Sequence, residues 1–227
     1  MSEIETPDFR IPNPRSVFQR ELEERNVTPV FVKESSPEFG KMREQLNTRS
    51  GIAIANHPSN LDVPLVGVAV ERTDFKIVSG RKGAPLLAEA IGNDHVISLD
   101  RRTPLALKKS FEEIFQQIDN GGLVIMYPTG GQRKHKPNQH NEYFQSGIRF
   151  ILKNIKSESM VYSFYIDPTN IDNLGENESV KIDENITDAA EWQEIIDKNS
   201  KNPEQLKVLT ENYLTKFNLD HFIFPNK

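Results

Sequence analysis

Short, uninterrupted apolar runs separated by stretches of helical spacing restrict the fold of this 227-residue chain more than any other feature. Runs such as Gly-Leu-Val-Ile-Met-Tyr-Pro, at residues 122–128, are typical of strands buried on both faces. We expect strands at residues 51–56, 74–79, 95–100, 123–127 and 160–166. This order predicts an α/β fold with a central mixed, largely parallel β-sheet flanked by helices.

Apolar residues at helical spacing predict the flanking helices. Two are expected between strands, at residues 105–119 and 143–153, and two after the last strand, at 189–199 and 203–217. Before the first strand, residues 15–25 and 37–46 are expected to form surface helices joined by a Pro-containing loop. The predicted organisation is therefore a small N-terminal helical layer at 1–50, packed on a core domain at 51–227. Residues 167–178 are expected to form a loop, and residues 179–186 a short edge strand.

Composition excludes several classes of protein. The chain has no cysteine, which excludes disulfides, thiolate metal sites and a cysteine nucleophile. Its longest apolar runs, 65–70 and 123–127, fall short of the roughly 18 residues that a membrane span needs. The first 25 residues resemble neither a signal peptide nor a transit peptide. We therefore expect a soluble protein of the cytoplasm or of a compartment like the plastid stroma, with peripheral membrane contact left open.

The distribution of charge indicates the kind of ligand. A net charge of −5 argues against nucleic-acid binding, because a phosphate backbone favours a basic protein face. Basic residues nevertheless outnumber acidic ones within residues 101–136. A local basic pocket on an acidic protein fits a small anionic ligand better than a polyanion.

The strongest candidates for a catalytic pair are His57, which directly follows Asn56, and Asp62, five residues later. Five residues of straight helix would turn the two side chains about 140° apart, but a turn at residues 58–60 brings Asp62 back under the imidazole. A neutral imidazole takes the proton of a hydroxyl that attacks a carbonyl, and a carboxylate fixes its tautomer. The alternative is an unrelated surface histidine followed by a helix-capping aspartate.

The pattern Asn-His-x-x-x-x-Asp resembles the first motif of the glycerolipid acyltransferases, a family that contains glycerol-3-phosphate and lysophosphatidate acyltransferases. Val-Ile-Ser-Leu-Asp-Arg-Arg, residues 96–102, is similar to the second block of that family, which helps to bind the acceptor's phosphate. Residues 124–137 resemble the third block, Pro-Glu-Gly-Thr or Pro-Glu-Gly-Gly. The resemblance covers roughly residues 50 to 166 and implies His57 and Asp62 as catalytic residues.

The third block departs from the family pattern, because Thr129 stands where most members carry Glu. In this it is closest to the soluble plastid-type glycerol-3-phosphate acyltransferases, in which Pro-Ser-Gly-Gly precedes clustered arginines. Gly130 and Gly131 permit close backbone approach, so the amides of residues 129–131 are expected to face an anion or an oxyanion. The candidate phosphate ligands are two pairs of basic residues, against the alternative of a solvated basic surface: Arg101, Arg102, Arg133 and Lys134.

The resemblance implies transfer of a fatty acyl group from acyl-CoA or acyl-ACP to the 1-hydroxyl of glycerol-3-phosphate, in phospholipid biosynthesis. The acyl carrier protein is then a further partner, and the enzyme needs no cofactor and no metal. Three alternatives stay open: lysophosphatidate or another acceptor, a catalytically silent homologue that binds an acyl carrier or a lipid phosphate, and a hydrolase in which His57 activates water.

Other chemically interesting side chains carry weaker hypotheses. Lys82 is interpreted as a surface lysine, with a contact to phosphate or to the donor's pantetheine arm as the alternative. The remaining histidines show no metal-ligand spacing: His95, His135, His140 and His221. The aromatic residues near the end are interpreted as helix-packing anchors rather than an acyl groove: Trp192, Phe217, Phe222 and Phe224.

Overall fold

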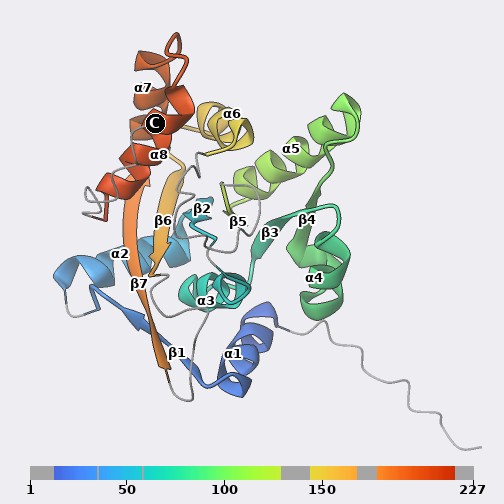
Figure 1. Ribbon diagram of the computed structural model, residues 1–227, viewed down its shortest axis with the longest axis vertical. Helices are drawn as coiled ribbons and strands as arrows, with labels where there is room; N and C mark the ends of the chain where they lie inside the picture. The colour runs from blue at the N-terminus through green and yellow to red at the C-terminus, as the bar shows by residue number, and fades with distance from the viewer. Residues whose placement is uncertain (1–12, 35, 58, 129–143, 168–177, 218–227) are drawn as a thin grey trace, which may run out of the picture.

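Seven strands form one sheet in the order β1-β7-β6-β2-β5-β3-β4 (Figure 1). The computed structural model describes residues 13–34, 36–57, 59–128, 144–167 and 178–217. The strands are β1 (Val27–Phe31), β2 (Gly51–Ala55), β3 (Phe75–Gly80), β4 (Val96–Leu99), β5 (Leu123–Met126), β6 (Met160–Ile166) and β7 (Glu178–Asp188). The five strands from β6 to β4 run parallel, and β7 pairs antiparallel with β6. β1 pairs parallel with β7. The predicted α/β fold with a mixed, largely parallel sheet is therefore confirmed.

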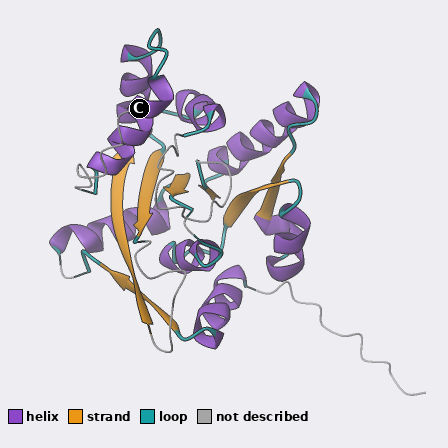
Figure 2. Cartoon of the chain, in the orientation of Figure 1, coloured by secondary structure: helices purple, strands orange, loops and turns teal. Residues whose placement is uncertain are grey.

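Helices cover both faces of this sheet, as Figure 2 shows. One core contains apolar side chains of α1 (Pro14–Glu24), α2 (Pro37–Thr48), α3 (Asp62–Ala69) and α4 (Ala84–Ile91). The other contains side chains of α5 (Pro104–Asp119), α6 (Ser146–Asn154), α7 (Ala189–Lys198) and α8 (Gln205–Thr215). All five residues of β2 are buried, because its alternate side chains enter opposite cores. Within the described ranges, no helix combines the length and the apolar character needed to cross a bilayer.

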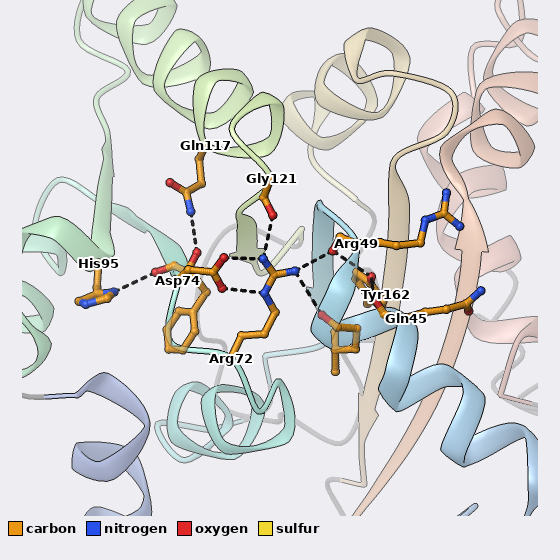
Figure 3. Close-up of polar contacts among 10 residues, drawn as sticks. Gln45, Arg49, Arg72, Asp74, His95, Gln117, Gly121 and Tyr162 are labelled. Carbon is orange, nitrogen blue, oxygen red and sulfur yellow. Dashed lines mark hydrogen bonds and ion pairs between the residues drawn. The ribbon is translucent and has the colours of Figure 1, made fainter.

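Arg72 joins the amino ends of the central strands (Figure 3). Its guanidinium forms two bonds with Asp74, which precedes β3, at 2.7 and 2.5 Å. It also donates to the carbonyls of Leu46 (3.2 Å), Arg49 (2.7 Å) and Gly121 (2.8 Å). The buried arginine therefore supplies a donor to carbonyls at the end of α2 and at the turn before β5.

The predicted elements are present within a few residues of their expected bounds, with three differences. Helix α4, between β3 and β4, and strand β1 were not predicted. The sequence Val-Thr-Pro-Val-Phe of β1 was interpreted as loop because of Pro29, but a proline is tolerated on the edge strand that β1 forms. The strand predicted at 179–186 is present, but it is neither short nor at the edge, because the 11-residue β7 lies between β1 and β6. The division of the chain at residue 50 stays a prediction.

Candidate active site

Asn56 fixes the end of β2, from which the candidate catalytic turn starts. Its Nδ2 donates to the carbonyl of Ile166 (2.8 Å), and the Ile166 N–H donates to Asn56 Oδ1 (2.7 Å). Ile166 is the last residue of β6, so the two bonds join the carboxyl ends of neighbouring strands. His57 therefore follows a point that is held to the sheet by backbone and side chain together.

The side chains of His57 and Asp62 meet across a tight turn. His57 Nδ1 lies 2.8 Å from Asp62 Oδ2, and the backbone N–H of Ser59 donates to the same oxygen at 3.2 Å. Asp62 is the first residue of α3. Since Nδ1 faces the carboxylate, a neutral imidazole that carries its proton there presents Nε2 as the basic nitrogen. The structure brings the pair together, and its catalytic role is a proposal.

Burial dominates the electrostatics of Asp62, whose side chain has no exposed area. Desolvation raises the pKa of its carboxyl, while the hydrogen bond and the charge of His57 and the N–H of Ser59 oppose that rise. Among the residues that the structure describes, Asp62 Oδ1 has no hydrogen-bond partner. The carboxylate therefore acts chiefly on one imidazole, which is the arrangement of a base with its orienting acid.

Tyr127 holds both members of the pair and was not predicted as a site residue. Its ring stacks on the imidazole of His57, with centroids 4.6 Å apart. Its hydroxyl donates to the backbone carbonyl of Asp62 at 3.1 Å. Burial, and then the charge of Asp62, raise the pKa of Tyr127 well above its usual range, so the phenol keeps the proton that it donates. The only sequence signal was an aromatic residue at the end of a predicted buried strand.

A pocket of about 520 Å³ lies at the carboxyl ends of β3, β4 and β5, beside His57. In α/β sheets, ligands bind outside the carboxyl ends of the strands. The polar residues that line it include His57, Ser79, Arg81, Asp100, Arg101, Arg102 and Gln145. The apolar residues that line it include Val63, Leu87, Leu99, Phe111, Met126 and Ile148. The pocket therefore offers an imidazole, guanidinium groups and an apolar wall to the same ligand.

The three arginines of the pocket differ in their partners. Arg102 pairs with Asp100 through Nη2 and Nε, at 2.5 and 3.0 Å, and this hydrogen bonding holds the pKa of Asp100 at about 2. Arg81 adds a smaller charge effect on the same carboxylate. Neither Arg81 nor Arg101 forms an ion pair with another described residue. Sequence reasoning missed Arg81. The adjacent Lys82, interpreted as a surface lysine, is exposed and is not among the residues that line the pocket.

The profile of the acyltransferase family matches residues 37–170, which is more than half of the chain. The chain belongs to the acyltransferase family. Comparison of its sequence with curated proteins gives no significant match. The predicted family is thereby confirmed at the level of an acyltransferase enzyme, and the closer likeness to the plastid-type enzymes stays a prediction.

Solved structures add a likeness of fold. The crystal structure of the 1-acyl-sn-glycerophosphate (LPA) acyltransferase PlsC from Thermotoga maritima matches with a TM-score of 0.54 at 13% identity, over 92% of this acyltransferase and 77% of PlsC. The ATPases DotB of Legionella pneumophila and Yersinia pseudotuberculosis match at 12% and 11% identity, with TM-scores of 0.37 and 0.38. They cover 84% and 85% of this chain, and the matches span 59% and 58% of theirs. Their scores are too low to carry an argument.

The third sequence block of this acyltransferase lies outside the described residues from residue 129 onward. This applies to Thr129, Gly130, Gly131, Arg133 and Lys134, and to His135 and His140. The residues that flank this segment, Pro128 and Gln145, both line the pocket, and the Gln145 N–H donates to the Pro128 carbonyl at 2.8 Å. The roles of the third block in binding phosphate and an oxyanion therefore stay predictions.

The other histidines and aromatic residues of this acyltransferase that were singled out from the sequence contact the backbone or the core where the structure describes them. Across the described ranges, no group of three or more His, Asp or Glu side chains is arranged to hold a metal. His95 Nδ1 lies 3.0 Å from the carbonyl of Phe75. Trp192 and Phe217 are buried in the core under α5 to α8, which confirms their prediction as packing anchors. His221, Phe222 and Phe224 lie outside the described residues.

Proposed function

We propose that this acyltransferase moves a fatty acyl group from an acyl thioester, acyl-CoA or acyl-ACP, to the primary hydroxyl of glycerol-3-phosphate. The observation that carries the proposal is the 2.8 Å contact between His57 Nδ1 and the buried Asp62, beside a pocket that also contains arginines. This contact leaves Nε2 for a substrate hydroxyl. The guanidinium groups supply a partner for the phosphate of that substrate.

The proposed reaction begins when His57 Nε2 takes the proton of the acceptor hydroxyl, whose oxygen then attacks the thioester carbonyl. Asp62 stabilises the resulting imidazolium through Nδ1–H, and Tyr127 keeps the ring in plane through its stacking contact. When the tetrahedral intermediate collapses, the carbon–sulfur bond breaks and the thiolate takes the proton from Nε2. The products are an ester and a free thiol, and His57 returns to its starting state.

The arrangement of the pocket supports specific roles for its cationic and apolar parts. Arg81 and Arg101 have no ion-pair partner among the described residues, so we assign them to the acceptor phosphate. Arg102 is held by Asp100 and contributes less charge to a ligand. The apolar wall, which includes Leu99 and Phe111, suits the first carbons of the fatty acyl chain. The backbone amides of residues 129–131 are the proposed oxyanion donors.

The test is release of free thiol from acyl-CoA and from acyl-ACP, measured with and without glycerol-3-phosphate. We expect release that depends on the acceptor and is nearly abolished in His57→Gln, a loss of about 10²- to 10⁴-fold. His95→Gln is the matched control, because His95 lies at the amino end of β4, whereas the pocket lies at the carboxyl ends of the strands. This variant should retain full activity.

Other outcomes would replace the proposal. Thiol release without any acceptor would indicate a hydrolase, and no release under any condition would indicate a silent homologue. Transfer to lysophosphatidate but not to glycerol-3-phosphate would overturn the proposed acceptor and leave the acyl transfer intact.

A further inference from the structure

We propose that helix α8 is a positioning element of the acyl-transfer site and acts through the hydroxyl groups of Tyr213 and Thr210. The inference rests on the proposed function and extends it to a part of the chain beyond residue 170, where the family match ends. α8 packs beside α6 and α7 on one face of the sheet (Figure 1). Both hydroxyl groups lie on residues that are almost fully buried.

Tyr213 binds the backbone at the start of the catalytic turn. Its hydroxyl accepts a hydrogen bond from the N–H of Asn56 at 3.1 Å and donates to the carbonyl of Phe164. Asn56 directly precedes His57, and Phe164 belongs to β6, which pairs with β2. The Asn56 N–H lies just beyond the last residue of β2, so the phenol supplies the partner that the strand does not. One side chain of α8 therefore fixes the residue from which His57 projects.

Thr210 lies one turn earlier on the same side of α8 and binds the backbone at the other boundary of the site. Its Oγ1 accepts from the N–H of Phe144 at 2.8 Å and donates to the carbonyl of Leu206 at 2.8 Å. The ring of Phe144 packs on that of Tyr213, with centroids 5.4 Å apart. The next residue, Gln145, bonds to the carbonyl of Pro128 beside the pocket. The two hydroxyls thus hold residues 56 and 144, at two boundaries of the site.

Removing a hydroxyl takes the partner away from the part-buried N–H of Asn56 or from the buried N–H of Phe144, and the backbone relieves this loss by shifting. A displacement of about 1 Å in a reacting group costs up to about 100-fold in rate. We therefore expect Tyr213→Phe, which keeps the ring contacts, to lower kcat about tenfold or more while the KM for the thioester stays unchanged. Thr210→Val should also lower kcat, but by a smaller factor. Its partner Phe144 is not adjacent to His57 in the sequence, whereas Asn56, the partner of Tyr213, directly precedes His57.

The matched control is Tyr162→Phe. Tyr162 is also buried, and its hydroxyl donates to the carbonyls of Gln45 (2.9 Å) and Arg49 (3.3 Å), at the amino end of β6 and away from the pocket (Figure 3). Urea unfolding should show that Tyr162→Phe and Tyr213→Phe lose similar stability. Only Tyr213→Phe should lose kcat. Equal losses of kcat in both variants would assign the effect to general destabilisation and overturn the inference.

A second measurement works without substrate. We expect the proton between His57 Nδ1 and Asp62 Oδ2 to give a downfield NMR resonance. This resonance should broaden or move in Tyr213→Phe and stay in place in Tyr162→Phe. An unchanged resonance together with unchanged kcat in Tyr213→Phe overturns the inference. If the wild-type enzyme transfers no acyl group, the proposed function fails, and the resonance alone still decides whether α8 positions His57.

Discussion

Replacing Asp62 with Asn tests the proposed chemistry most sharply, because the structure predicts a large loss of activity with little loss of stability. Ser59 N–H and His57 Nδ1 both approach the same oxygen, Oδ2, while Oδ1 has no partner among the described residues. An Asn side chain therefore keeps both bonds if its oxygen takes the place of Oδ2. The reverse orientation would set its NH₂ against the Ser59 N–H, so the oxygen-first orientation is favoured and the tautomer of His57 is kept.

What Asp62→Asn removes is the negative charge that stabilises the imidazolium in the transition state. Two unit charges about 4 Å apart interact by about 4 kcal/mol at an effective dielectric constant of about 20. This corresponds to a loss of about 10³-fold in kcat. The amide placed at Oδ1 costs about 1 to 3 kcal/mol as a buried unpaired donor. Loss of a buried carboxylate whose pKa is raised by desolvation offsets part of this cost.

The assay compares kcat for acceptor-dependent thiol release with the free energy of unfolding in urea, for the wild type and Asp62→Asn. We expect kcat to fall about 10³-fold while the free energy of unfolding changes by less than about 2 kcal/mol. A kcat within tenfold of the wild type would refute the reasoning, because the charge of Asp62 would then have no part in the transition state. Loss of folding would refute the predicted side-chain orientation instead.

Three further predictions separate binding, stability and pH dependence. Arg101→Ala should raise the KM for the acceptor about tenfold, and Arg102→Ala should raise it less, because Asp100 already pairs with that guanidinium. Arg72→Met should lower the free energy of unfolding in urea by about 3 kcal/mol at unchanged kcat, since three carbonyls lose the hydrogen bond from the guanidinium. Burial raises the pKa of Glu184 to about 7, against the opposing charge of Arg43, from 4.5 in an unfolded chain. The folded state then binds the extra proton, so the free energy of unfolding should fall by about 3 kcal/mol between pH 4.5 and pH 7, and Glu184→Gln should abolish that fall.

The parts of the fold that the sequence predicts well are those whose signal is local. The strand at 160–166 is recognised because seven consecutive residues suit a buried strand, and the structure has the same bounds. The approach of Asp62 to His57 also follows from local geometry, since a turn is the only path that joins a strand end to a helix start over five residues. Both predictions required no knowledge of the rest of the chain.

The parts that escaped prediction depend on contacts between distant residues. Strand β7 was predicted as a short edge strand, yet it lies inside the sheet, and Glu184 is buried there because Arg43 of α2 pairs with it at 2.5 Å. Tyr127 contacts His57 only because β5 lies beside β2. Tyr213 lies 157 residues from Asn56 in the sequence. No periodicity or motif within either segment indicates these pairings.

The amino ends of the strands (the amino edge of the sheet) and their carboxyl ends (the carboxyl edge) are held together by different contacts. This difference explains why stability and activity should respond to different substitutions. At the amino edge, one charged side chain, Arg72, binds carbonyls from several segments, and it lies away from the pocket. At the carboxyl edge, the Asn56 side chain binds the N–H and the carbonyl of Ile166, and the Tyr213 hydroxyl binds the N–H of Asn56, directly before His57. A lost contact at the amino edge therefore weakens the whole sheet without moving the imidazole. A lost contact at the carboxyl edge moves the imidazole, while the strands keep their ladders and both cores remain packed.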